Sequence, residues 1–568
     1  MVQPLSYTLT LTKTEAAAGY FQAVPENISH LDDMLAALRH TPMDSFLHKS
    51  ALDLLADFTQ DELKTHIQQA KTQQDSILLS LICEHLLLSR GRGKIRNYFS
   101  DQEIKELGTH SPLVHLRCAL EPNRRLHSQW IRLFREKMIS HGDLPPLDAS
   151  GLPPICSGEC QPIVTAGLAI NDIHKRHFCA QTASSGFSAE ETTETALGKL
   201  SSAGVFLEQE MRHQSSLSPI ALLRKWRFKT TTENGRHQFT LSGTQTSYGK
   251  GLTLEDARVS LSMEIVERCA SFASVSRKGV LGTQKEYPLI HGSWSSLVKQ
   301  GEKAINPQEL AQEVTYRDEP LYWIEGDQPG KQGQEKVWLP AQALFLFLNL
   351  DEIDLFSGLG STGLASGNTL AQAKVSALLE VVERHQEGTV PFDPATCFRL
   401  VAQEERLSSL LESHRSLGID VLFQDITPPS GIPCCKCFVK GKDGIIHKGT
   451  AAHLNARKAI ISALTETPYP FPEGPPSQPL KGDFTLVGYE NLPDFTTGTP
   501  ESDLTLLEEL LVSQNKPPVY VDLTRKDMNI PVVRAIVPGM EIMGDFDQFS
   551  RVHPDLFHNY MTREVNIK

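Results

Sequence analysis

The sequence has few cysteines and no long apolar run, and these two absences narrow the class of protein. Ten cysteines are scattered along 568 residues, which favours reduced thiols over a disulfide framework. The most apolar stretches, such as Ala341–Leu350, have about half the length needed to cross a bilayer. The first residues lack a basic stretch followed by an apolar core, so no signal peptide is expected. We therefore expect a cytoplasmic protein that does not bind a membrane.

An excess of positive charge is also missing. The net charge is −13, and no dense Lys/Arg tract occurs. Nucleic-acid-binding surfaces are basic, so we expect no nucleic-acid partner. The common phosphate-binding loops, GxxxxGK[ST] and GxGxxG after a strand, are absent as well. Any nucleotide site in this chain must therefore be built in another way.

The spacing of apolar residues and the Pro-rich stretches divide the chain into four parts. Residues 1–142 have helical spacing and predict an all-α accessory domain without motifs that suggest chemistry. The parts that follow are a linker, a mixed α/β domain and a C-terminal tail, over 143–177, 178–550 and 551–568. All motifs with chemical content lie beyond the linker. A fragment produced by cutting within Pro145–Pro154 is therefore expected to fold and to keep its ligand site.

The most informative feature is an internal repeat. Leu254–Arg268 reads LEDARVSLSMEIVER, and Leu370–Arg384 reads LAQAKVSALLEVVER. Eight of the fifteen positions are identical at a constant offset of 116 residues. Two unrelated amphipathic helices would share Leu and Ala by composition, but they would seldom share Ser, Glu, Glu and Arg in register. The two segments therefore predict duplicated helices with a common role.

In each copy a serine and two glutamates form one stripe of the expected helix, and an arginine lies beside it. The residues are Ser260, Glu264, Glu267 and Arg268 in the first copy, and Ser376, Glu380, Glu383 and Arg384 in the second. Carboxylates three residues apart repel each other, and the other helix faces are apolar, so a buried pair needs compensation. Hard oxygen ligands of this kind suit Mg²⁺. The repeat thus indicates a magnesium–nucleotide site between the two helices.

At these residues the sequence resembles the YcaO family, whose Ser-x3-Glu-x2-Glu-Arg motif corresponds to Ser260–Arg268. The family's second segment resembles Ser361–Thr369 followed by Glu380–Arg384. Ala463–Glu466 is similar to the third nucleotide-binding element of the family, and Ser188–Thr192 to its opening helix. The resemblance implies an α/β (α+β) YcaO-like domain with an internal pseudo-two-fold repeat, preceded here by the all-α domain.

The resemblance also implies ATP and Mg²⁺ as cofactors. The Mg²⁺ ligands it implies are Glu264, Glu267, Glu380 and Glu383. The residues it implies around ATP are Thr192, Ser260, Glu264, Glu267, Arg268, Asn368, Gln372, Glu380, Glu383, Arg384 and Glu466. We further expect the carboxylates of both helices and Glu466 to converge on one cavity.

Members of the family activate peptide amides. In the chemistry that the resemblance implies, a nucleophile adds to the amide carbonyl, ATP phosphorylates the oxyanion, and loss of phosphate leaves an azoline, a thioamide or an amidine. The expected activity is that of an ATP-dependent cyclodehydratase or thioamide synthetase in peptide or protein modification, as in the biosynthesis of ribosomal peptide products. The expected partners are a peptide or protein substrate and a sulfur-delivery or leader-peptide-binding protein, and a homodimer is one arrangement that the sequence allows.

Some positions depart from the family pattern. Ser462 stands where the third element usually has Arg, and the chain ends MTREVNIK instead of Pro-x-Pro-x-Pro. The second difference favours a thioamide over an azoline. Two alternatives remain open: a degenerate nucleotide-binding scaffold that captures a protein partner, and an accessory factor for ribosomal-protein methylthiolation.

The densest group of thiols is Cys434, Cys435 and Cys437. Cys156 and Cys160 could in principle complete a zinc site with them, but no second CxxC pair exists. A buried strand is the favoured interpretation of 434–437, and a metal site or sulfur-carrying thiols are the alternatives.

Overall fold

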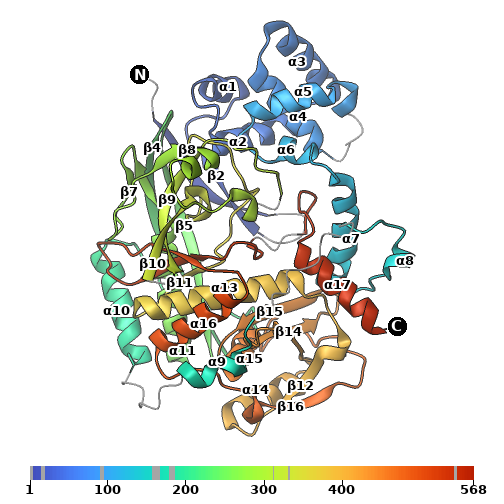
Figure 1. Cartoon of the computed structure of the whole chain (residues 1–568), viewed down its shortest axis with the longest axis vertical. Coiled ribbons are helices and arrows are strands. Elements are labelled where there is room, and N and C mark those ends of the chain that lie inside the picture. Colours follow the sequence, from blue (N-terminus) through green and yellow to red (C-terminus); the bar gives the residue numbers. More distant parts are fainter. Residues whose placement is uncertain are drawn as a thin grey trace.

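The computed structural model describes residues 4–13, 19–89, 95–155, 167–177, 186–310, 313–330, 333–542 and 546–567. Within these residues three β-sheets are surrounded by helices, and a helical region lies at one end (Figure 1). The expected fold class, a mixed α/β domain preceded by a helical region, is confirmed. None of the described helices is long and apolar enough to span a membrane.

The first sheet contains two strands from the very start of the chain. Its order is β2-β1-β5-β4-β6-β7, with β3 beside β4. The strands are Leu5–Lys13 (β1), Gly19–Pro25 (β2), Met211–Arg212 (β3), Ile220–Asn234 (β4), His237–Gly251 (β5), Ser274–Ser276 (β6) and Gly279–Leu281 (β7). β1 runs parallel to β5, with Leu5 opposite Phe239. The prediction that residues 1–142 are all α-helical is therefore wrong for Leu5–Lys13 and Gly19–Pro25.

The helical region follows these strands, as expected from the sequence. Its α-helices are Leu31–His40 (α1), Ser45–Leu55 (α2), Gln60–Gln73 (α3), Ser76–Leu88 (α4), Asp101–Leu107 (α5), His115–Ala119 (α6) and Arg124–Ser140 (α7). Side chains cap several of these helices: Asp44 accepts hydrogen bonds at the start of α2, and Thr59 forms a capping box with Glu62 in α3. The apolar sides of α1 to α4 pack together at the top of the molecule (Figure 1).

Two further sheets form the rest of the molecule. The second has the order β10-β9-β17-β18-β11 with β8 beside β9, and the third has the order β15-β14-β13-β12-β16. The strands of the second sheet are Ile290–Gly292 (β8), Leu321–Gly330 (β9), Gly333–Pro340 (β10), Leu364–Ser366 (β11), Val519–Asp522 (β17) and Val532–Ile536 (β18). Those of the third are Cys397–Val401 (β12), Leu422–Asp425 (β13), Cys434–Lys440 (β14), Ile446–Ala452 (β15) and Thr485–Gly488 (β16).

The repeated segments are helices, as the sequence predicts. They lie in Leu254–Ser271 (α11) and Leu370–Thr389 (α13), which Thr253 and Thr369 cap at equivalent positions. α11 packs on β4 and β5, whereas α13 packs on β11, β15 and β18. The remaining α-helices are Ala189–Ser202 (α10), Trp294–Lys299 (α12), Glu405–Ser416 (α14), Ala456–Glu466 (α15) and Pro500–Ser513 (α16). The pseudo-two-fold relation of the two repeats stays a prediction.

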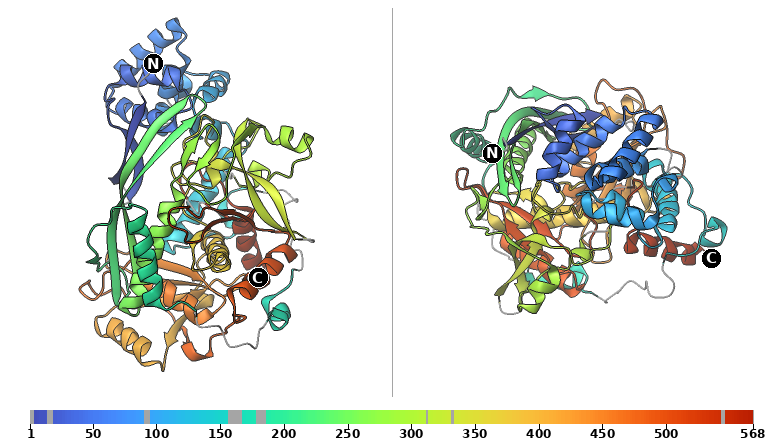
Figure 2. Two further views of the ribbon diagram at one scale, coloured as in Figure 1. Left: turned by 90° about the vertical axis from the view of Figure 1, so that its left-hand side faces the viewer. Right: turned by 90° about the horizontal axis from the view of Figure 1, so that it is seen from above.

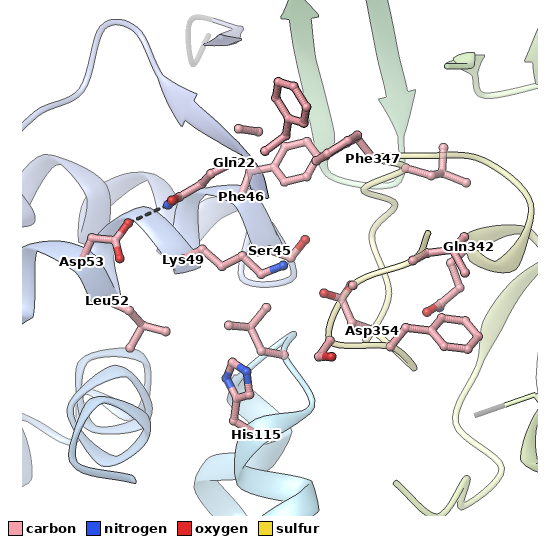
Figure 3. Close-up of a pocket in the computed structure, with 18 of the residues that line it drawn as sticks. Gln22, Ser45, Phe46, Lys49, Leu52, Asp53, His115, Gln342, Phe347 and Asp354 are labelled. Carbon is pink, nitrogen blue, oxygen red and sulfur yellow. Dashed lines mark hydrogen bonds between the residues drawn. The ribbon is translucent and has the colours of Figure 1, made fainter. Parts of the chain in front are cut away.

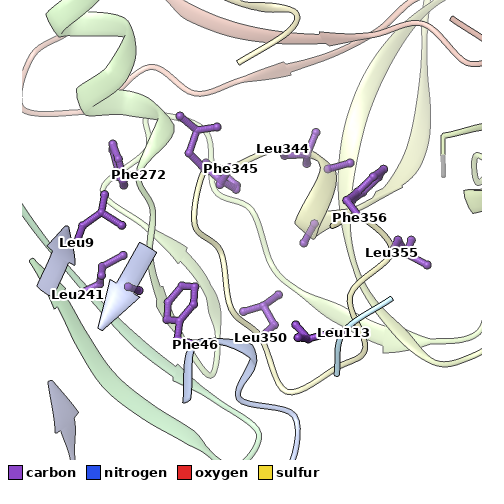
Figure 4. Close-up of a cluster of buried hydrophobic side chains, with 14 of the residues drawn as sticks. Leu9, Phe46, Leu113, Leu241, Phe272, Leu344, Phe345, Leu350, Leu355 and Phe356 are labelled. Carbon is purple, nitrogen blue, oxygen red and sulfur yellow. The ribbon is translucent and has the colours of Figure 1, made fainter. Parts of the chain in front are cut away.

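One hydrophobic core joins the first strands, the helical region and the α/β part. Leu9 of β1, Phe46 of α2 and Leu241 of β5 face Phe272 and Phe345 from later in the chain (Figure 4). The long strands β4 and β5 extend beside the helical region and beside the body of the molecule (Figure 2). The helical region is therefore part of the same packed unit as the first sheet.

The expected linker and tail are also more structured than the sequence analysis predicts. Residues 143–177 contain Leu147–Ser150 (α8) and Ile170–His177 (α9), and α9 packs against α16. The segment expected as a tail forms Pro554–Ile567 (α17). Its Tyr560 contacts Trp130 of α7. Helix α17 also contacts α13, because its Asp555 Oδ2 lies 3.2 Å from His385 Nε2.

Candidate nucleotide-binding site

The carboxylates of α11 lie close to an arginine and to the backbone of β5. Glu264 accepts a hydrogen bond of 3.1 Å from the Tyr248 backbone N–H. Arg268 Nε lies 3.8 Å from Glu264 Oε1 and 3.7 Å from Glu267 Oε1. Burial raises the pKa of Glu264 to about 7, although Arg268 opposes this shift. Burial also raises the pKa of Glu267. The surroundings therefore only partly stabilise the ionised form of each carboxylate.

The second helix repeats this arrangement with more charges. Arg384 lies 3.3 Å from Glu383 and 2.9 Å from Glu387, one turn further along α13. Burial, with the charges of Glu380 and Glu387, raises the pKa of Glu383 to about 8, although Arg384 opposes this shift. Glu387 behaves in the opposite way: burial would raise its pKa, but Lys448 and Arg384 hold it at about 2. Glu387 is therefore a permanent anion that fixes Arg384 beside Glu383.

The carboxylates of the two repeats and of α15 are electrostatic neighbours. Glu380 raises the pKa of Glu267 across the two helices. Glu466 of α15 raises the pKa values of both Glu264 and Glu383. Strand β11 links the helices directly, because its Ser366 hydroxyl donates to the Met263 carbonyl of α11. Five carboxylates from three helices thus form one electrostatic group, and their convergence on one cavity stays a prediction.

The side chains of this group are partly buried and partly exposed to solvent. Their exposed fractions are 29% for Glu264, 16% for Glu267 and 14% for Glu383. Glu466 is exposed, and its Oε2 lies 2.5 Å from the Lys250 ammonium. Carboxylates that repel one another and remain accessible form a suitable donor set for a hard divalent cation.

The other residues expected around ATP include Thr192, Asn368 and Gln372, which form hydrogen bonds with one another. The Asn368 side-chain amide donates to the Thr192 hydroxyl at 3.1 Å, so α10 meets the loop before α13 as expected. The Gln372 side chain accepts a hydrogen bond from the Asn368 backbone N–H, so it shapes this loop. Ser260 is exposed one turn before Glu264. Hydrogen bonds therefore connect Thr192, Asn368 and Gln372 to one another.

Sequence reasoning missed four charged residues of this group. Arg534 of β18 is fully buried and acts on both Glu267 and Glu380. Lys250 pairs with Glu466, and Lys448 lies 3.0 Å from Glu387. The sequence signals were weak: Lys250 lies between two glycines, Arg534 interrupts an apolar strand, and Glu387 extends the stripe of α13.

Two glycines explain how Lys250 comes so near to the helices. A Cβ at Gly249 would lie 2.1 Å from the Ala257 carbonyl oxygen, and a Cβ at Gly251 would lie 2.5 Å from Asp256. A Cβ at Gly367, the equivalent position before α13, would lie 2.5 Å from the Ala373 nitrogen. Only glycine allows β5 and the loop before α13 to approach the first turns of their helices so closely.

The thiol cluster lies in a strand, as the favoured interpretation predicts. Cys434, Cys435 and Cys437 are all buried in β14. Burial raises the pKa of Cys437 to about 12, so its thiol is protonated and unreactive at neutral pH. Cys156 and Cys160 lie outside the described residues.

Comparison with known proteins identifies the family. The model of the family described as "YcaO cyclodehydratase, ATP- and Mg²⁺-binding" matches residues 248–468 and 467–541. The chain belongs to the YcaO family. ATP and Mg²⁺ are therefore its cofactors, and the matched residues include α11, α13, α15 and β18. The partly open carboxylate group has the donor chemistry that this family requires.

Individual YcaO relatives are distant. An uncharacterised protein of Methanothermobacter thermautotrophicus is 28% identical over 331 residues, which are 52% of this chain and 81% of the relative. A solved heterocyclase in complex with substrate and cofactor is 18% identical, with a TM-score of 0.48. It matches 66% of this chain, and the match spans only 56% of the heterocyclase. A YcaO structure from Methanopyrus kandleri with AMPPCP and Mg²⁺ is 21% identical over 62% of this chain and 92% of its own length, with a TM-score of 0.44.

Proposed function

We propose that this YcaO protein uses Mg²⁺·ATP to activate a backbone amide of a peptide or protein, with a thioamide or an azoline as the product. The observation that carries the proposal is the group of five carboxylates from α11, α13 and α15 with cations between them. Phosphoryl transfer requires mainly metal ions, cationic side chains and exact positioning of the reactants. The carboxylates can hold the metal ions, and Arg268, Arg384 and Lys250 supply cationic side chains beside them.

In this proposal each part of the site has a separate task. Glu264, Glu267, Glu380 and Glu383 hold Mg²⁺, and bound Mg²⁺·ATP supplies the phosphoryl group. Arg268 and Arg384 face the phosphates from the two repeats, and Lys250 adds a cation beside Glu466. Thr192, Asn368 and Gln372, which hydrogen bonds connect, would bind the nucleoside part of ATP. The enclosed position of the site strengthens these electrostatic interactions.

The substrate and the partners belong to the same proposal. A peptide or protein substrate is expected from the family, and a sulfur-delivery or leader-peptide-binding protein is the expected partner. The absence of Arg at position 462 favours the alternative of a scaffold that binds ATP without rapid turnover. Ser462 is exposed on α15, and Lys250 is a cation that pairs with Glu466 on the same helix.

The test of the ATP site is a set of four charge-removing variants. Glu264→Gln, Glu267→Gln, Glu380→Gln and Glu383→Gln should each weaken Mg²⁺·ATP binding at least about 100-fold, which corresponds to about 3 kcal/mol. Calorimetric titration measures the affinity. Glu255→Gln is the matched control, because Glu255 is exposed on the same helix α11, and it should bind as the unaltered protein does. Equal affinity in all variants would refute the shared site.

Phosphate release separates the enzyme from the scaffold. We expect Mg²⁺·ATP to be hydrolysed faster when a substrate peptide is present, with an azoline or thioamide detected by the mass change of the peptide. Tight binding of ATP without phosphate release at any peptide concentration would favour the scaffold.

A further inference from the structure

A second cavity lies far along the chain from the carboxylate group, between the helical region and the α/β part. Its volume is about 560 Å³, which is in the range of small-molecule sites. The walls come from β2, from α2 and α6, and from the segment 342–359 (Figure 3). None of the carboxylates proposed to bind Mg²⁺ is among its lining residues. The cavity is therefore a separate site.

A cation and a carboxylate face this cavity from opposing elements. Lys49 extends from α2, and Asp354 comes from the segment that faces it (Figure 3). Burial raises the pKa of the Asp354 carboxyl, and the charge of Lys49 opposes this shift. Within the described part of the chain, neither side chain takes part in a direct ion pair or hydrogen bond. The Asp354 backbone, in contrast, is fixed, because its N–H donates to the Pro112 carbonyl at 2.8 Å.

A third polar group, His115, is held at the cavity wall by a buried carboxylate. Its Nδ1 lies 2.8 Å from Glu84 Oε1. Glu84 is fully buried, and it also accepts hydrogen bonds from His48 and Ser111. Burial would raise the pKa of Glu84, but the bonds from His115 and His48 lower it well below its usual range. The ionised carboxylate therefore fixes Nδ1 as the protonated nitrogen of His115 and leaves Nε2 as an acceptor.

The remaining wall of the cavity is aromatic, and one of its residues has a strained backbone. Phe46 and Phe347 lie on the side of the cavity opposite His115 (Figure 3). Phe347 has a φ of 53°, which is the left-handed region that bulky residues avoid. Backbone strain of this kind costs of the order of 1–3 kcal/mol and is concentrated at binding and catalytic sites. An apolar group of a ligand would fit against these rings.

We propose that this cavity binds a free apolar α-amino acid. Lys49 pairs with the ligand's carboxylate, Asp354 and His115 Nε2 accept hydrogen bonds from its ammonium group, and its side chain packs among the phenylalanines. A ligand with a carboxylate alone would leave Asp354 without a partner, and an amine alone would leave Lys49 without one. An apolar α-amino acid satisfies both charges and the aromatic wall. The proposal does not depend on the activity proposed for the ATP site.

The test is calorimetric titration of the full-length protein with L-phenylalanine and L-leucine, and at least one of them should bind saturably. Three probes each lack one feature: N-acetyl-L-phenylalanine lacks the ammonium group, phenethylamine lacks the carboxylate, and glycine lacks the side chain. Each should bind at least tenfold more weakly than the better of the two amino acids. No saturable binding of either amino acid at millimolar concentration would overturn the proposal. So would tighter binding of the dipeptide Phe-Gly, which would assign the cavity to a peptide terminus.

Two variants connect the binding to the cavity. Lys49→Met and Asp354→Asn should each weaken amino-acid binding at least tenfold. Lys64→Met is the matched control, because Lys64 lies on the surface of the same helical region and pairs there with the exposed Asp61. Mg²⁺·ATP titration of the same variants verifies that they are folded and tests the ATP site independently. Unchanged amino-acid affinity in both cavity variants would refute the proposed contacts.

Discussion

At the scale of single residues, Arg534 is a charged side chain buried beside the carboxylate group. Its side chain is fully buried in β18, and two of its nitrogens donate to the Gly360 carbonyl at 3.1 Å. Burial lowers its pKa to about 10, against the opposing charges of Glu380 and Glu267. The guanidinium is therefore ionised at neutral pH and connects the two carboxylate pairs to the loop before β11.

We expect Arg534→Met to weaken Mg²⁺·ATP binding at least about tenfold, or about 1.4 kcal/mol, because the carboxylates lose their buried cation. Loss of the two bonds to Gly360 should also reduce the free energy of unfolding by about 1–3 kcal/mol. Calorimetry and urea unfolding measure the two effects. Arg534→Lys should retain part of the affinity for Mg²⁺·ATP. The loss of affinity caused by Arg534→Met should be smaller when Glu380→Gln is already present, because neighbouring charges are coupled. Additive losses would show that Arg534 acts elsewhere.

Residue-level prediction from the sequence succeeded where a pattern was repeated. The duplicated stripe predicts that the carboxylates of the two helices lie close together, and Glu380 does raise the pKa of Glu267 across the helices. Arg534 and Lys250 could not be predicted in the same way. Their roles depend on which strand lies beside which helix, and one residue in a strand gives no information on that.

At the scale of elements, the close contact of Gly449 with α15 fixes the position of that helix against β15. A Cβ at Gly449 of β15 would lie 2.4 Å from the Ala463 carbonyl oxygen and 2.6 Å from the Thr467 nitrogen of the α15 end. Both atoms are backbone atoms, so they can move away only if the helix and the strand separate. The position of Glu466 at the end of α15 therefore depends on Gly449.

We expect Gly449→Ala to lower the free energy of unfolding by about 1–3 kcal/mol through overpacking, and to weaken Mg²⁺·ATP binding because Glu466 shifts. The matched control is Gly198→Ala in α10, where no atom lies within 4 Å of the added Cβ. This control should be neutral or should stabilise the helix by about 0.5–1 kcal/mol. The midpoints of urea unfolding compare the two variants. Equal midpoints would contradict the close contact between β15 and α15.

Elements were predictable where the apolar spacing was read correctly. The helical spacing within residues 1–142 predicts helices there, and α2, α3 and α4 confirm this prediction. Strand β1 was missed although Leu5, Tyr7, Leu9 and Leu11 alternate with polar residues. Helix α17 was missed because 551–568 is short and lies after the family motifs, yet its Leu556, Phe557 and Tyr560 are spaced for one buried face.

At the scale of the whole molecule, the N-terminal part and the α/β part share a sheet and a core. The pairing of β1 with β5 and the contacts of Tyr7 with Phe46 and Phe239 cross between them. Trp130 of α7 packs in the same way against Phe557 of α17. The sequence predicts separate domains for these parts because its motifs indicate which residues carry chemistry but do not indicate which elements pack together.

We now expect a fragment that starts at residue 155 to be insoluble or unfolded, contrary to the expectation from the sequence alone. Its β5 edge and the partners of Tyr7 and Phe46 would be exposed, and exposed sheet edges aggregate. Solubility, gel filtration and circular dichroism of the fragment test this. Co-expression of 1–154 with 155–568 should restore a soluble complex that binds Mg²⁺·ATP. A soluble 155–568 fragment that binds Mg²⁺·ATP by itself would show that the two parts are independent.

The parallel pairing of β1 with β5 also determines the order in which the protein can assemble. Parallel neighbours need a crossover connection, and here the whole helical region lies between Leu5 and its partner Phe239. On the ribosome, β1 and β2 emerge well before β5, while α1 to α4 can already form from local contacts. The β1–β2 hairpin therefore keeps the β1 edge unpaired until β5, which ends at residue 251, has been synthesised. Lys250 lies at the end of that late strand, so the nucleotide site can be completed only after the sheet has closed.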